Sequence, residues 1–222
     1  MKNIALLALA SGMAIAAASP ANAAIIIAYS VNGGAITQLA TDAGTPGSVG
    51  FVGTAGNFTF NTGAFGFPVT SQFDLLTQSI NIQNNQGSRA PATLNVFVTE
   101  TNLPTLNGGT LMSSFTSNTL QNNTARISSF YSTTNALYGG TLLRTTNFLT
   151  PGTSSNVDVV SAAGPFSLTT RYDIAFGAGF GNFNGTANIT AVPEPATWGM
   201  MIVGFGLMGG ALRRRSTKVA FA

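Results

Sequence analysis

The stretch FSLTTRYDIAF, from Phe166 to Phe176, alternates between two kinds of side chain at every second residue. One set is mostly apolar and holds Phe166, Leu168, Thr170, Tyr172, Ile174 and Phe176. The other set is mostly polar and includes Arg171 and Asp173. Because successive side chains of a strand point to opposite faces, this pattern predicts a long strand with one buried face.

The same alternation recurs along the chain and predicts further strands. It is clearest at Thr93–Glu100, and shorter runs lie at Ile25–Val31, Val49–Val52, Phe58–Phe60, Leu76–Ile82, Leu111–Phe115, Ala125–Tyr131, Thr141–Arg144 and Asn156–Val160. Turn sequences such as Asn32-Gly33-Gly34 separate them, at spacings typical of antiparallel sheets. We therefore predict an all-β fold, an antiparallel β-sandwich spanning residues 24–191. A β-solenoid is the alternative, ranked second because no fixed repeat is evident.

One glycine-rich segment, Gly177 to Gly185, has the spacing G-x-G-x-G with no Lys nearby and no helix after it. These features do not fit a nucleotide-binding loop. We expect a hairpin or a final turn there, with Phe180 and Phe183 packed on the sheet.

The composition excludes several kinds of chemistry. The chain has no Cys and no His, so disulfides, thiolate nucleophiles, imidazole bases and imidazole metal ligands are absent. Lys2 and a C-terminal cluster supply most of the positive charge. Between the two ends the chain has four Arg and five acidic residues, so its net charge there is close to zero and no basic surface for nucleic acid is expected.

Five acidic residues of the predicted domain are candidates for chemistry: Asp42, Asp74, Glu100, Asp158 and Asp173. A glycan hydrolase needs two paired carboxylates, and these acids are scattered, so we predict no enzyme, no cofactor and no metal. Glu100 and Asp158 are expected at solvated strand ends, and Arg171 with Asp173 as an exposed ion pair. Asp42 is the best single candidate for calcium, but a turn Asp that bonds its own backbone is the preferred interpretation.

Carbohydrate binding is an alternative function for the domain. Sugar sites combine aromatic rings with uncharged polar groups, and Tyr131, Tyr138 and Tyr172 are available together with many Asn, Gln and Ser. Tyrosines packed in the core would explain the same residues.

The N-terminus has the pattern of a secretory signal peptide over residues 1–23. Lys2 is followed by an apolar run from Ile4 to Ala18. Ala21-Asn22-Ala23 then provides the small residues that signal peptidase accepts, which predicts cleavage before Ala24.

The C-terminus combines Pro193-Glu194-Pro195 and Trp198 with an apolar segment and the basic residues Arg213, Arg214 and Arg215. The apolar segment, residues 196–212, is long enough for a short transmembrane helix. The positive-inside rule predicts that the basic cluster at residues 213–218 lies on the cytoplasmic side of this helix and the preceding domain on the outer side.

This tail, residues 192–218, resembles the PEP-CTERM sorting signal of Gram-negative bacteria in its PEPxxWA-type variant. Gly199 stands where the variant has Ala after the Trp. The resemblance implies recognition by an exosortase, a membrane-embedded cysteine transpeptidase that cuts near the PEP motif and releases or re-attaches the exported domain. It also implies a setting of exopolysaccharide and biofilm production.

The expected function is that of an exported, exosortase-processed protein of the cell surface or exopolysaccharide matrix, with a structural or adhesive role. The alternative is a carbohydrate-binding module, and a glycan hydrolase is a distant third. The expected partners are signal peptidase, exosortase, the inner membrane during transit and exopolysaccharide. Before processing the chain would be anchored in the membrane, and afterwards it would lie in the envelope or outside the cell.

Overall fold

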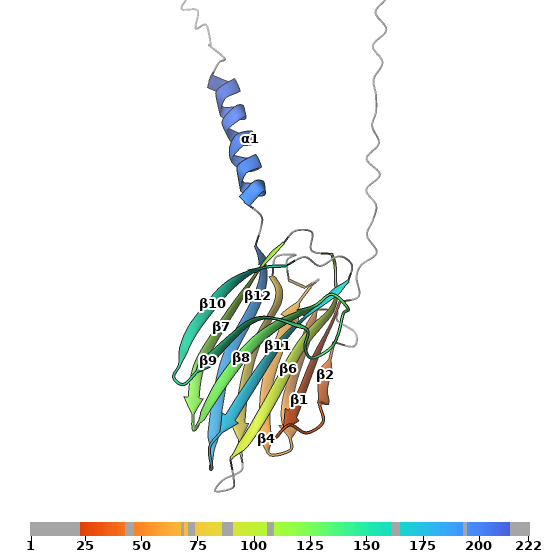
Figure 1. Ribbon diagram of the computed structural model, residues 1–222, viewed down its shortest axis with the longest axis vertical. Coiled ribbons are helices and arrows are strands. Elements are labelled where there is room, and N and C mark those ends of the chain that lie inside the picture. The colour runs from red at the N-terminus through yellow and green to blue at the C-terminus, as the bar shows by residue number, and fades with distance from the viewer. Residues whose placement is uncertain are drawn as a thin grey trace, which may run out of the picture.

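The computed structural model describes residues 23–42, 47–67, 69–70, 74–85, 91–105, 109–160, 165–192 and 195–213. Within these residues the chain forms twelve strands and one helix. The strands form two six-stranded sheets that lie against each other, and the helix follows the last strand at one end (Figure 1).

Sheet A has the strand order β2-β1-β6-β11-β8-β9. Its strands are β1 (Ala24–Val31), β2 (Thr37–Thr41), β6 (Ala92–Leu103), β8 (Asn123–Ser132), β9 (Thr141–Phe148) and β11 (Phe166–Phe176). Sheet B has the order β10-β7-β12-β5-β4-β3. Its strands are β3 (Ser48–Ala55), β4 (Phe58–Gly66), β5 (Asp74–Asn84), β7 (Thr110–Gln121), β10 (Gly152–Val159) and β12 (Gly181–Val192).

The predicted all-β fold is confirmed, and each described pair of neighbouring strands is antiparallel. Each run that the alternation singles out lies in a strand, apart from a last residue at Val160, and β11 has the bounds of the predicted strand Phe166–Phe176. The chain crosses repeatedly between the two sheets, so the arrangement is sandwich-like and differs from the coil of a solenoid.

The core lies between the sheets and is built from their inward-facing apolar side chains. Aromatic rings from opposite sheets meet there: the rings of Tyr172 and Phe183 lie 6.0 Å apart, and those of Phe58 and Phe176 lie 5.6 Å apart. Such pairs add about 0.5–1.5 kcal/mol to the free energy gained from burying their surface. They therefore help to fix how the two sheets sit on each other.

The prediction of a turn at Gly177–Gly185 is wrong for its second half. Residues from Gly181 onward form β12, a central strand between β5 and β7. Gly185 lies within this strand, at a position where the neighbouring atoms leave no room for a side chain. A Cβ there would lie 2.7 Å from Cζ of Phe183 and 2.9 Å from the carbonyl oxygen of Thr116. Phe183 is buried as expected, whereas Phe180 is 70% exposed.

The C-terminal segment forms α1 (Pro195–Arg213), and its described apolar side chains, such as Ile202 and Phe205, are exposed. Within the described residues, no helix has both the length and the apolar character needed to cross a membrane. The predicted transmembrane helix at residues 196–212 is therefore not supported. The segment carries five glycines, which dilute its apolar side chains: Gly199, Gly204, Gly206, Gly209 and Gly210.

Candidate functional site

The outer face of sheet B carries uncharged polar side chains in register across four strands, β4, β5, β12 and β7. We call this surface the polar face. Strand pairing arranges it in four rows. They are Phe65–Thr77–Asn188–Ser114, Gly63–Ser79–Thr186–Thr116, Asn61–Asn81–Asn184–Thr119 and Thr59–Gln83–Asn182–Gln121.

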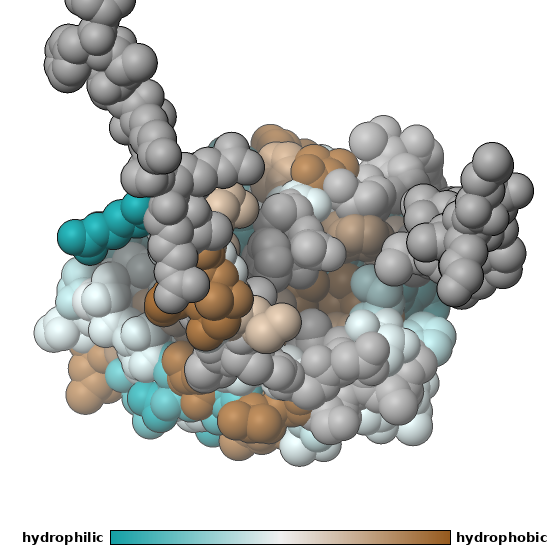
Figure 2. Space-filling model, turned by 90° about the horizontal axis from the view of Figure 1, so that it is seen from above, coloured by the Kyte–Doolittle hydropathy of each residue, from teal (hydrophilic) through white to brown (hydrophobic). Residues whose placement is uncertain are grey.

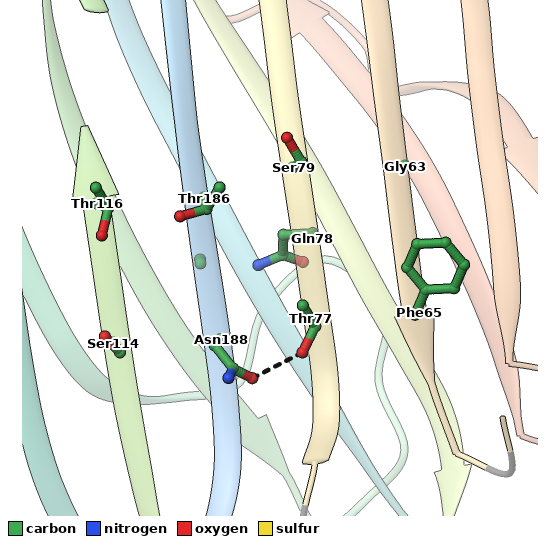
Figure 3. Close-up of a pocket in the computed structure, with 10 residues that line it drawn as sticks. Gly63, Phe65, Thr77, Gln78, Ser79, Ser114, Thr116, Thr186 and Asn188 are labelled. Atoms are coloured by element: carbon green, nitrogen blue, oxygen red, sulfur yellow. Dashed lines mark hydrogen bonds between the residues drawn. The ribbon is translucent and has the colours of Figure 1, made fainter. Parts of the chain in front are cut away.

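A groove of about 410 Å³ crosses the first two rows (Figure 3). Both rows line it, together with Gln78 and Ala187 between them. In the second row Gly63 has no side chain and the other three residues have short ones. Phe65, which is 48% exposed, stands at one end of the first row. The groove exists because short side chains on four neighbouring strands lie beside a row that begins with a large aromatic ring.

The groove presents hydroxyl and amide groups as hydrogen-bonding partners. The Thr77 hydroxyl donates to Oδ1 of Asn188 over 2.9 Å, which fixes the orientation of the Asn188 amide (Figure 3). The Nδ2 donor of Asn188 therefore points away from this bond. In the described part of the chain, no hydrogen bond occupies the side-chain hydroxyls of Ser79 and Thr186.

The polar face carries no charge on any residue of its four rows. The arginines that the structure describes lie elsewhere: Arg126 on β8, Arg144 on β9, Arg171 on β11 and Arg213 at the end of α1. Seen from the end that carries α1, the coloured surface is mostly pale or brown, with strongly hydrophilic residues in small patches (Figure 2).

Glu100 is not at a solvated strand end, as the sequence predicts, but is fully buried within β6. The strand continues to Leu103. Because every second side chain of a strand points to the same face, Glu100 shares the inward face with Val96 and Val98. Neither carboxyl oxygen makes a well-formed hydrogen bond within the described residues. The pKa of Glu100 is raised to about 9, mainly by burial; the Phe67 backbone amide lowers this pKa, and the nearby carboxylate of Asp42 contributes to the rise.

The other acids that the structure describes do not combine with Glu100 into an open catalytic pair. Asp42 accepts the Gly47 amide over 2.9 Å, which agrees with the expected turn role. Asp158 accepts the amide of Asn156 over 2.9 Å. Asp74 is exposed at the start of β5.

The ion pair expected between Arg171 and Asp173 is present at 3.0 Å, but it is part of a larger cluster. Arg126 binds the same carboxylate at 2.7 Å, and Asn95 also donates to it over 2.5 Å. Only 10% of the Asp173 side chain is exposed, so the pair is less open to water than expected.

The tyrosines proposed as sugar platforms do not lie on the polar face. Tyr172 is fully buried in the core, where burial raises the pKa of its hydroxyl and the Gln78 side chain opposes this shift. Tyr138 packs edge-on against Phe97 on the outer side of sheet A, and partial burial raises its pKa. Tyr131 is half-buried on β8. The aromatic residue of the groove is Phe65, which no pattern in the sequence singles out.

The predicted sorting and cleavage residues flank the strands. β12 ends at Val192, immediately before Pro193. Ala23 is buried, and Ala24 is the first residue of β1. Pro195 and Trp198 lie in the first turn of α1, and Arg213 is its last residue. Ala21, Pro193, Glu194, Arg214 and Arg215 lie outside the described residues.

The chain is similar to several solved structures at low sequence identity. TmCBM61, solved with β-1,4-galactotriose, has 11% identity and a TM-score of 0.32 over 64% of this chain and 92% of its own. The K1 cleaved adhesin domain of Lys-gingipain from Porphyromonas gingivalis W83 has 9% identity and a TM-score of 0.35, covering 66% and 97%. The CBM22-1 xylan-binding domain of Paenibacillus barcinonensis Xyn10C has 8% identity and a TM-score of 0.34, covering 68% and 88%. These likenesses are too distant to bear on function.

No curated protein matches the chain in a sequence search. The profile of the PEP-CTERM protein-sorting motif, however, matches residues 191–215. This segment contains the Pro-Glu-Pro sequence, Trp198 and the three arginines from Arg213 to Arg215. At its C-terminal end the chain therefore carries a PEP-CTERM protein-sorting motif.

Proposed function

We propose that the chain is an exported protein of the cell surface or exopolysaccharide matrix, delivered to an exosortase by its tail, with an adhesive role for its β-domain. The observation that carries this proposal is the sorting motif at residues 191–215. A sorting motif has a purpose only if the chain reaches the machinery that reads it. The proposal therefore includes export across the inner membrane.

The placement of the strands supports processing at both ends. β12 ends at Val192, so a cut near Pro193 to Pro195 leaves every described strand in the released domain. Signal peptidase cutting before Ala24 would leave β1 whole as well. In this scheme residues 1–23 and the tail from Pro193 onward are targeting signals that are removed, and the β-domain is the mature protein.

The surface of α1 supports recognition by a membrane-embedded enzyme. Its described apolar side chains are exposed on every side, including Met200, Ile202, Phe205 and Leu207. Apolar surface of this extent gains free energy when a partner removes it from water. An exosortase would supply that partner while it reads the Pro-Glu-Pro sequence.

The adhesive role is assigned to the polar face, which supports carbohydrate binding better than catalysis. Its rows supply hydroxyl and amide groups beside the exposed ring of Phe65. A glycan hydrolase needs two accessible carboxylates on either side of the substrate. Among the described acids, Glu100 is fully buried and Asp173 is held by two arginines.

The test of sorting is the double variant Pro193→Ala with Glu194→Ala, expressed in the host. We expect the wild-type protein to lose its tail and the double variant to keep it. The control is Thr190→Ala, a change on β12 just before the matched segment, which should leave processing intact. Mass spectrometry of the mature C-terminus decides: the same terminus in the wild type and the double variant would refute the proposal.

A further inference from the structure

We infer that the groove on the polar face binds one strand of a neutral polysaccharide, with Phe65 as its stacking platform. This inference rests on the proposed adhesive function and names its ligand. It is argued from the shape of the groove, its hydrogen-bonding groups, its aromatic residue and its lack of charge.

The shape of the groove suits an extended, linear ligand. The second row of its lining runs across β4, β5, β12 and β7, from Gly63 to Thr116. With neighbouring strands about 4.8 Å apart, this row is ~14 Å long. A ligand that lies along it contacts four strands at once, as a chain of several sugar rings can.

The hydrogen-bonding groups suit sugar hydroxyls, which both donate and accept. The Thr77 hydroxyl is committed to Oδ1 of Asn188, so Nδ2 of Asn188 is left to donate to a ligand. The side-chain hydroxyls of Ser79 and Thr186 each offer a donor and an acceptor. Strand pairing fixes the spacing of these groups before a ligand binds, and such preorganisation lowers the cost of binding.

Phe65 supplies the apolar contact that sugar rings need on one side. Its side chain is 48% exposed at the end of the first row and pairs across the strands with Thr77. Contact between an exposed Phe ring and water is unfavourable. A sugar ring that stacks on the Phe removes this apolar surface from water, which favours binding. Ligand sites combine aromatic side chains with placed polar groups that fix the orientation of the ligand, and Phe65 is the aromatic member here.

The absence of charge narrows the ligand class. Uronate and sulfated glycans and nucleic acids are polyanions that bind through Lys and Arg, and no residue of the four rows is basic. A membrane or a protein partner would need a broad apolar patch, but the face offers one aromatic ring among hydroxyls and amides. A neutral polysaccharide fits both restrictions.

The test uses the full chain in mild detergent and measures binding by affinity electrophoresis. The neutral probes are β-1,4-glucan, galactan and xylan, and polygalacturonate is the acidic probe. Gly63→Tyr should fill the groove and abolish binding, because a Cβ there meets nothing closer than the Val49 carbonyl oxygen at 4.0 Å. Phe65→Ala should weaken binding by about tenfold.

Gly50→Tyr is the matched control. Gly50 pairs with Gly63 from the next strand, β3, and is exposed, but it does not line the groove. This variant should bind like the wild type. Far-UV circular dichroism before each assay shows whether Gly63→Tyr and Gly50→Tyr keep the same fold.

The expected result is binding to at least one neutral probe, equally strong at low and high ionic strength and lost only in the groove variants. Binding that survives Gly63→Tyr would overturn the site, and binding to polygalacturonate as strong as to the neutral probes would overturn the ligand class. Binding to none of the probes would overturn the inference as a whole. Sorting is judged separately, by the mature C-terminus, so its outcome and this one can differ.

Discussion

The Glu100 carboxyl group lies directly against the backbone of Gly66, across the space between the two sheets. A Cβ on Gly66 would lie 2.4 Å from Oε2 and 2.6 Å from Oε1 of Glu100. Gly66 is the last residue of β4 in sheet B, and Glu100 lies within β6 of sheet A. The missing side chain at Gly66 therefore makes room for a carboxyl group in the core.

Gly66→Ala should destabilise the domain by about 1–3 kcal/mol, because the added methyl group overpacks a site that is already filled. The change should cost much less in a Glu100→Ala background, where the carboxyl group is gone. Urea unfolding of the wild type, both single variants and the double variant measures the coupling between the two residues. Additive effects would show that the two groups do not press on each other.

Glu100 should also make stability depend on pH. Its pKa is raised from 4.5 to about 9, so the folded protein keeps a proton that the unfolded chain releases above pH 4.5. The stabilisation is complete below pH 4.5 and is lost as the pH rises towards 9, at up to ~1.4 kcal/mol per pH unit. Urea unfolding at a series of pH values should show this decline.

Glu100→Gln removes the titrating group and should flatten the decline. It should also make the domain more stable than the wild type at neutral pH, since a neutral amide replaces a group that is costly to ionise. Asp74→Asn is the control, because it makes the same kind of change, acid to amide, at an exposed position. A wild-type slope that persists in Glu100→Gln would assign the pH dependence to other groups.

The position of Glu100 shows what sequence periodicity can and cannot predict. Leu94, Val96 and Val98 predict the buried face of β6 correctly, and Glu100 continues the same alternation. A charged side chain is usually solvated, so the sequence alone predicts that the strand ends at Glu100. The space that accepts it comes from Gly66, which is distant in sequence and belongs to the other sheet.

The same limits apply to β12 and to the groove. Phe183, Gly185, Ala187 and Ile189 alternate correctly, but glycine and alanine on the inward face weaken the apolar signal. The groove needs the register of four strands, which only the folded chain supplies. By contrast, the sorting motif is contiguous in sequence, so it could be found without any structure.

A further prediction concerns the segment between β8 and β9, which folds over the outer side of sheet A. Asn135 accepts the backbone amide of Asn102 over 2.8 Å and donates to the Asn102 side chain over 2.6 Å. Asn135→Ala should lose both bonds and cost about 1–3 kcal/mol. Hydrogen exchange at residues 133–140 should become faster.

Asn135 also has a positive φ of 59°, which Ala adopts at a cost. Asn135→Gly separates the two effects, because Gly adopts this conformation freely but cannot form the bonds. If the segment is held by the hydrogen bonds, both variants should show faster exchange. Protection that returns in Asn135→Gly would assign the effect to backbone conformation alone.

The last prediction concerns where the domain ends. β12 pairs with β5 and β7 up to Thr190 and Val192, and its Ala187 and Ile189 side chains are buried in the core. A fragment from Ala24 to Val192 should therefore fold, with one cooperative unfolding transition. A fragment that stops at Thr186 would lose the second half of β12, with its pairing to both neighbours and the buried Ile189, at a cost of several kcal/mol. Thermal unfolding by circular dichroism compares the two, and equal midpoints would mean that β12 beyond Thr186 belongs to the tail and not to the fold.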